Sequence, residues 1–98
     1  MDIRFADSRL EKDFNDMRSL VRKHGAQRAK KLAQRAGQLA DAETLADFRH
    51  LPGHCHELMG NRKGQLALDL DGPYRLLFEP DHDPLPLTKE GGLDWSLV

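Results

Sequence analysis

Four side chains in the second half of the chain combine positive charge with imidazole chemistry: His56, Arg62, Lys63 and Arg75. Arginine can hold a phosphate through two parallel hydrogen bonds, and histidine gains and loses protons near neutral pH. Cleavage of RNA by its own 2′-hydroxyl needs that proton removed, the charge at phosphorus stabilised and the leaving oxygen protonated. These side-chain types can perform all three tasks without a metal, so we interpret them as candidate catalytic residues acting on RNA.

Each candidate also has a purely structural interpretation, and the sequence leaves both open. Arg75 could serve only as the ion-pair partner of Asp69, and His56 could be an ordinary hydrogen-bonded residue of a sheet. Arg62 and Lys63 could belong to a solvated hairpin loop.

Other chemistries find less support in the residue pattern. His54 and His56 alternate along an expected strand and could share a zinc ion, but no third ligand follows at a recognised spacing. We therefore expect no metal and no cofactor. Cys55 is the only cysteine, which excludes an internal disulfide, and it has no activating neighbour in the sequence. We interpret it as a small buried apolar residue.

Positive charge is concentrated in the first half of the chain. Between Arg18 and Arg35 lie seven basic residues and no acidic one, whereas Leu51–Val98 holds four basic and eight acidic residues. Such a block can neutralise phosphates or pair with an acidic protein, and the plain alternative is a solvated helix face. The candidates for RNA contact in this block are Arg22, Lys23, Arg28, Lys30, Lys31 and Arg35.

The size of the chain limits what can position these residues. Its 98 residues are 39% apolar and 32% charged, with a net charge of −1, which suits a single small domain spanning residues 1–98. A domain of this size buries little more than about 60% of its unfolded surface, so a stabilising partner would fit. The single cysteine, with neither a signal-peptide pattern nor a membrane-length apolar run, predicts a cytoplasmic protein.

The first half reads as a short strand followed by helices. Asp2–Phe5 predicts an opening strand, and Ser8-x-x-Glu11 predicts a capping box that starts a helix. Helical spacing places Leu10, Phe14 and Met17 on the buried side, with the helix able to run on through Leu20 and Val21.

Gly25 should divide this helix from the next. From Ala26 to about Ala40, small residues with helical spacing predict close packing: Ala29, Leu32, Ala33, Ala36, Leu39 and Ala40. Thr44-x-x-Asp47 then predicts a short capped helix containing Leu45 and Phe48, which Pro52-Gly53 ends.

The second half reads as an antiparallel sheet with strands at His56–Leu58, Gln65–Leu70 and Tyr74–Phe78. A three-residue Asp71-Gly72-Pro73 loop pairs Leu68 with Leu76 and Asp69 with Arg75. We favour this register because a two-residue loop would place Leu68 and Arg75 on a common face. Residues 81–92, with Pro84, Pro86 and Gly91-Gly92, predict an irregular loop or arm.

The segment Leu51–Pro80 (LPGHCHELMGNRKGQLALDLDGPYRLLFEP) resembles the core of the RelE/HigB-type toxins of bacterial toxin–antitoxin pairs. The shared pattern is a Leu-Pro-Gly turn, a His-x-Leu strand, a G-[DN]-R-x-G loop and an aromatic-Arg-hydrophobic strand. Phe5-x-x-Ser8-x-Leu10-x-Lys12 and Gly91-Gly92-Leu93-Asp94-Trp95 are similar to one branch of that group, so the likeness covers nearly the whole chain.

The resemblance implies an α+β domain of RelE-like fold, with an N-terminal strand and two to three helices packed on an antiparallel sheet. It implies a toxin that cuts mRNA on the ribosome without a metal until a helix-turn-helix, HigA-like antitoxin binds it. The strand arginine of the family falls on Arg75, its strand histidine on His56 and its basic hairpin on Arg62 and Lys63.

Two departures from the family pattern bear on activity. Met59 stands where several relatives have a lysine, and the chain ends at Val98, where relatives continue into another strand and a histidine-containing tail. A sheet without that strand would have a less protected edge, which favours pairing with a partner or a homodimer. The alternative to an active nuclease is therefore a catalytically inactive, C-terminally shortened interaction module of the same fold.

Overall fold

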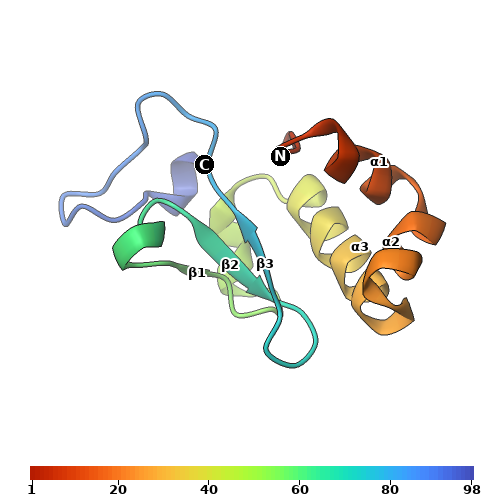
Figure 1. Cartoon of the computed structure of the whole chain (residues 1–98). Helices are drawn as coiled ribbons and strands as arrows, with labels where there is room; N and C mark the ends of the chain where they lie inside the picture. The colour runs from red at the N-terminus through yellow and green to blue at the C-terminus, as the bar shows by residue number, and fades with distance from the viewer.

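Three helices precede a three-stranded antiparallel sheet in the computed structural model, which describes all residues from Met1 to Val98. Figure 1 shows the helices gathered on one side and the sheet with the C-terminal segment on the other. The helices are α1 (Ser8–Asn15), α2 (Met17–His24) and α3 (Ala26–Asp41); the strands are β1 (His56–Glu57), β2 (Leu66–Asp69) and β3 (Arg75–Phe78). Three short 3₁₀ helices complete the set: η1 (Leu45–Arg49), η2 (Gly60–Arg62) and η3 (Trp95–Leu97). An α+β fold is confirmed.

Two aspartates set the boundaries of the first helices. The carboxylate of Asp7 accepts a hydrogen bond from the backbone N–H of Leu10 at 2.8 Å, so Asp7 is the N-cap and the predicted Ser8 cap is wrong by one residue. Asp16 caps α2 in the same way, through the N–H of Arg18 at 3.0 Å. This second cap ends α1 at Asn15 instead of letting one helix run on to Val21.

The break at Asp16 changes which residues the first helices bury. Leu10 and Met17 are 37% and 46% exposed, so the predicted buried side is wrong at both positions. Leu20 takes the central buried place, packed with Ala29 and Leu32 of α3. The predicted division at Gly25 and the helix that follows it are confirmed, but the predicted packing face is wrong at Ala33 and Ala40, which are exposed.

The N-terminal segment is not a strand, contrary to the prediction for Asp2–Phe5. The ammonium group of Met1 donates to the carbonyl oxygens of Ala40 and Ala42, at 2.8 and 2.6 Å, near the end of α3. Those carbonyls lack helical partners, so they attract a cation and draw the segment to the helix.

The predicted hairpin register is confirmed at every pair. Leu68 lies opposite Leu76, and Asp69 lies opposite Arg75. The backbone N–H of Leu70 donates to Tyr74 O at 3.0 Å, which closes the three-residue loop. A slip of one residue would have exposed the leucines, and burial of Leu66 and Leu68 at 0% excludes it.

The two faces of the sheet differ in what covers them. Leu66 and Leu68 pack on Leu39 of α3 and on Leu45 and Phe48 of η1. The opposite face carries His56, Asp69, Arg75 and Leu77, and Leu77 is 41% exposed. The helices pack only on the leucine face, so this opposite face is left open. Ala67 is buried there all the same, because it lies between its register partners His56 and Leu77.

The chain after Pro80 is mostly irregular, as predicted, and it returns to the core at its end. Leu93 is buried in the main apolar cluster, and the backbone N–H of Leu45 donates to Val98 O at 3.0 Å. No helix of the protein combines the length and the apolar character needed to cross a membrane.

Candidate functional site

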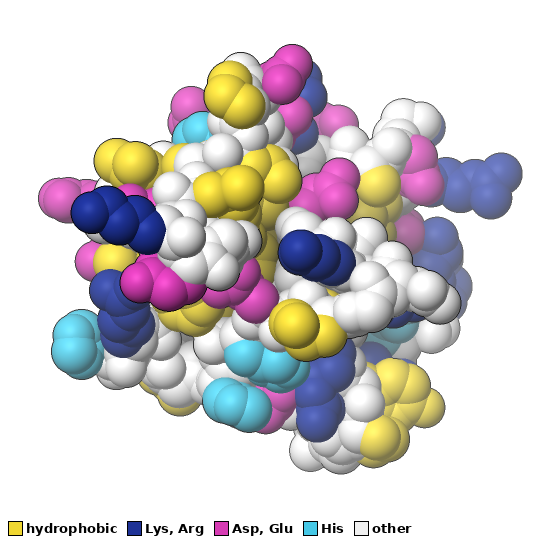
Figure 2. Space-filling model, turned by 90° about the vertical axis from the view of Figure 1, so that its left-hand side faces the viewer, with side chains coloured by type: hydrophobic (Ala, Val, Ile, Leu, Met, Phe, Trp, Pro, Cys, Tyr) yellow, Lys and Arg dark blue, Asp and Glu magenta, His cyan; other side chains and the backbone are white.

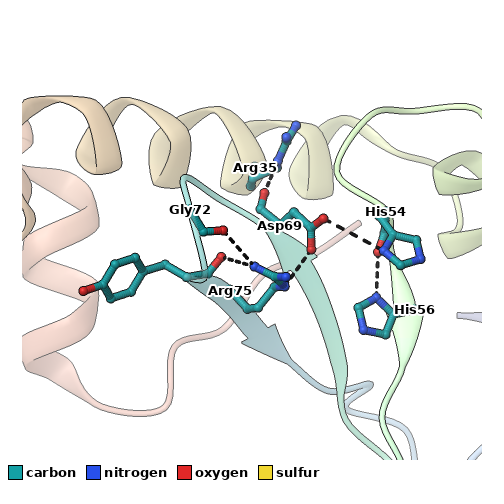
Figure 3. A network of polar contacts seen from close by, with 7 residues as sticks. Arg35, His54, His56, Asp69, Gly72 and Arg75 are labelled. Atoms are coloured by element: carbon teal, nitrogen blue, oxygen red, sulfur yellow. Dashed lines mark hydrogen bonds and ion pairs between the residues drawn. The ribbon is translucent and has the colours of Figure 1, made fainter.

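A polar cluster lies on the open face of the sheet, at the end of β2 and the start of β3 (Figure 3). It consists of Asp69, Arg75, His54 and His56. The hairpin register makes Asp69 and Arg75 direct neighbours, while His56 is the first residue of β1 and His54 lies in the turn before it. Two of the four predicted catalytic residues, His56 and Arg75, therefore meet in one network.

The guanidinium of Arg75 is held by its own hairpin. Its Nε lies 2.8 Å from Asp69 Oδ1, and its Nη1 donates to Tyr74 O at 2.9 Å and to Gly72 O at 3.3 Å. Asp69 Oδ1 is shielded from solvent, and the Arg75 guanidinium forms an ion pair with it. The Arg75 side chain is 40% exposed, and its Nη2 has no partner within the chain.

The two histidines are stacked, with ring centroids 4.6 Å apart and an interplanar angle of 25°. His56 Nδ1 lies 2.7 Å from the carbonyl oxygen of His54. A carbonyl only accepts hydrogen bonds, so Nδ1 of His56 carries the proton and Nε2 of the neutral ring is left as an acceptor. His54 Nδ1 lies 3.9 Å from Asp69 Oδ2, and the backbone φ of 50° at His54 places that ring beside the carboxylate.

Arg35 of α3 supports the cluster from behind and is not a surface residue. It is 4% exposed, and its Nε donates to the backbone oxygen of Asp69 at 2.9 Å. Its Nη1 donates to Gln38 Oε1 at 3.0 Å. The expectation that Arg35 contacts RNA is therefore corrected: its guanidinium is enclosed and joins α3 to the sheet.

The other candidate cations between Arg18 and Arg35 differ in whether an acidic side chain pairs with them. Arg28 pairs with Asp71 at 3.1 Å and lies over the Tyr74 ring, 3.3 Å from its centroid. Lys23 pairs with Asp13 at 2.6 Å. Three further candidates keep solvent-accessible charge without an ion pair: Arg22, which donates to Ser19 Oγ, and Lys30 and Lys31, which have no side-chain partner.

Arg62 and Lys63 lie away from the cluster. Arg62 is the last residue of η2 and Lys63 follows it, near the other end of β2, and Arg62 Nη1 donates to Gln65 Oε1 at 3.2 Å. The four residue steps from Gln65 to Asp69 span roughly 13 Å of strand. These two cations can touch a long ligand that also reaches Arg75, but they cannot touch the same phosphate.

A cleft of about 450 Å³ adjoins the cluster, between η1, β1 and the C-terminal segment, with His54 and Trp95 on its walls. Figure 2 shows this side of the molecule, with apolar side chains in a hollow bordered by charged groups and histidines. Glu57 fixes one wall by accepting from Leu93 N at 2.9 Å and from the Trp95 indole N–H at 3.1 Å. Burial, with a smaller contribution from Glu57, raises the pKa of Cys55 to about 12, so its thiol is protonated and unreactive at neutral pH.

Sequence reasoning underestimated three residues of the network. Arg35 had a signal, because it lies three residues after Leu32 and four before Leu39, on the buried stripe of α3. The sequence predicts Asp69 only as a partner of Arg75, and nothing in it reveals the shielded oxygen. His54 has a sequence signal only as a zinc ligand, and the protein has no group of three or more His, Cys, Asp or Glu side chains arranged to hold a metal ion.

Comparisons of the chain with protein-family models, with curated proteins and with solved structures found no match.

Proposed function

We propose that this protein is a RelE/HigB-like toxin of a type II toxin–antitoxin pair, an endoribonuclease that cuts mRNA on the ribosome. The observation that carries the proposal is the cluster of Arg75, Asp69, His54 and His56 on the face of the sheet that the helices leave open. A RelE-like fold agrees with helices preceding an antiparallel hairpin whose register brings the strand arginine to that face. The proposed site of action is the cytoplasm, and the proposed inhibitor is a helix-turn-helix antitoxin.

The cluster supplies the groups that attack by an RNA 2′-hydroxyl requires. In the proposed reaction, Nε2 of His56 takes the proton of the 2′-hydroxyl, and the 2′-oxygen then bonds to phosphorus. The P–O5′ bond breaks, and the leaving oxygen takes a proton from a protonated His54 beside Asp69. The products are a 2′,3′-cyclic phosphate and a 5′-hydroxyl end, and no redox change or metal is needed.

Arg75 is the proposed stabiliser of charge at the phosphate. Its Nη2 is unpartnered, while contacts with Asp69, Gly72 and Tyr74 fix the plane of the guanidinium. A donor fixed in this way acts on the charge that develops in the transition state without a cost of reorganisation. Cations outside the cluster, namely Arg62, Lys63, Lys30 and Lys31, are proposed to contact RNA backbone beyond the cut.

The test is incubation of purified protein with an mRNA, with and without ribosomes that are translating it. We expect cuts only with ribosomes, ends of the cyclic-phosphate and 5′-hydroxyl type, and loss of cutting in His56→Ala. Intact mRNA with active ribosomes would contradict the nuclease.

One observation favours a second candidate, a catalytically inactive interaction module of the same fold. Arg75 makes contacts to Asp69, Gly72 and Tyr74 of its own hairpin, as expected of a structural residue. Under this alternative the mRNA stays intact, while the protein still forms a stable complex with the helix-turn-helix protein encoded beside it. Size-exclusion chromatography of the co-expressed pair measures that complex.

A further inference from the structure

Strand β3 forms one border of the sheet, and no strand pairs with its outer side. The strand order is β1-β2-β3, so β2 occupies only one side of β3. Arg75 and Leu77 are exposed, whereas Leu76 and Phe78 are partly buried. We propose that β3 pairs antiparallel with β3 of a second copy of this chain. This homodimer is independent of whether the protein cuts RNA.

The direction of the backbone groups shows which residues would make the pairing. The N–H of Leu70 donates to Tyr74 O, so the backbone groups of Tyr74, and by alternation of Leu76 and Phe78, point toward β2. The N–H and C=O groups of Arg75, Leu77 and Glu79 therefore point outward, and no turn, loop or cap bonds to them. The edge offers three donors and three acceptors in a row.

One register uses all of these groups and matches charges. With Leu77 opposite Leu77 of the partner subunit, Arg75 lies opposite Glu79 of the partner subunit, and the reverse pair forms by symmetry. All six outward donors of the two copies then meet acceptors. The side chains of these pairs lie on the open face, where two leucines cover each other and two Arg–Glu pairs flank them.

Other registers are poorer for identifiable reasons. Moving the centre by one residue, to Leu76 or Phe78, leaves only four backbone bonds and places a charged side chain opposite Leu77 of the partner subunit. A register that pairs odd with even residues would set an open-face side chain against a core-facing one. Pro80 does not interfere, because its missing N–H belongs to the set that points toward β2.

Pairing would also bear on the polar cluster. Glu79 of the partner subunit would approach the unpartnered Nη2 of Arg75, so the homodimer and a bound phosphate would compete for the same guanidinium. The second copy fits this edge because the sequence from Arg75 to Glu79 is complementary to itself when reversed.

Sedimentation velocity of the full chain from about 1 μM to 1 mM tests the proposal, because edge-only interfaces are small and weak. Two variants alter the centre of the interface: Leu77→Lys and Leu77→Glu. Position 77 is 41% exposed, so both should fold, which circular dichroism checks. Each variant alone places like charges opposite each other and should raise the dissociation constant about tenfold or more. An equimolar mixture should restore the dimer through Lys–Glu pairing.

The matched control is the same pair of substitutions at Leu87, which is 56% exposed and distant from β3 in sequence. These variants should dimerise like the wild type, alone or mixed. A wild type that stays monomeric at 1 mM, or a dimer that neither Leu77 variant weakens, would overturn the proposal. Failure of the mixture to recover would overturn the register.

Discussion

Replacement of Gly53 by alanine should strongly destabilise the fold, because this glycine fills the space between the sheet and Arg35. A Cβ atom at this position would lie 3.1 Å from Cζ and Nε of Arg35 and 3.2 Å from Cδ2 of Leu68. Its φ of 112° is a conformation that alanine adopts only with strain. The carbonyl of Gly53 also accepts from Asp69 N at 2.7 Å, which limits backbone adjustment.

The magnitude follows from two costs. Strain at a positive φ costs about 1–3 kcal/mol, and overpacking of a filled interior costs about 1–3 kcal/mol. Neither neighbour can yield cheaply: Arg35 is 4% exposed and bonded to the Asp69 carbonyl, and Leu68 is fully buried. We expect a loss of about 3 kcal/mol, a large share of the roughly 5–15 kcal/mol typical of such domains.

Urea unfolding followed by circular dichroism measures this loss, with Gly37→Ala as the matched control. Gly37 lies within α3, and a Cβ there would meet nothing within 4 Å. The control should stabilise the protein by about 0.5–1 kcal/mol, since alanine is the better helix former. A Gly53→Ala protein as stable as the wild type would refute the packing of Gly53 against Arg35.

Three further predictions concern single side chains. Arg35→Ala should destabilise the protein by about 2 kcal/mol or more in urea unfolding, whereas the exposed Lys30→Ala should change it by no more than about 0.5 kcal/mol; equal effects would contradict the role given to Arg35. Cys55 should react with iodoacetamide at pH 8 on the order of a hundredfold more slowly in the folded than in the unfolded protein. Because its pKa is raised from 9.0 to about 12 on folding, the free energy of unfolding should also fall as the pH rises through that range, and a thiol that reacts at the unfolded rate would refute the burial. Glu57→Ala should shift the fluorescence of Trp95, the only tryptophan, to longer wavelength, because water takes the place of the carboxylate beside the indole N–H; an unchanged spectrum would contradict that contact.

The parts of the fold that were predicted correctly follow from local patterns. The hairpin register was predictable because a slip of one residue moves every leucine to the wrong face. The helix α3 and its start after Gly25 follow from helical spacing and from the glycine. The hairpin register also correctly predicts that Arg75 lies beside Asp69.

The errors arose where a distant group decides the outcome. The segment Asp2–Phe5 has a strand pattern, but the Met1 ammonium binds carbonyls near the end of α3. The positive charge of Arg35 predicts a surface position, yet its guanidinium is buried and donates hydrogen bonds to the Asp69 carbonyl and to Gln38 Oε1. The stacking of His54 on His56 depends on a positive φ at a non-glycine residue, which no local pattern announces.

The central claim is that Arg75 stabilises charge at a phosphate, and the rate of ribosome-dependent mRNA cleavage by Arg75→Ala tests it most directly. The control is Arg9→Ala, an exposed arginine of α1 for which the structure shows no ion pair, and both variants should first be shown to be folded. We predict that Arg75→Ala lowers the rate about 10²–10³-fold while Arg9→Ala leaves it unchanged. Equal cleavage by wild type and Arg75→Ala would contradict the claim and leave Arg75 as a structural partner of Asp69.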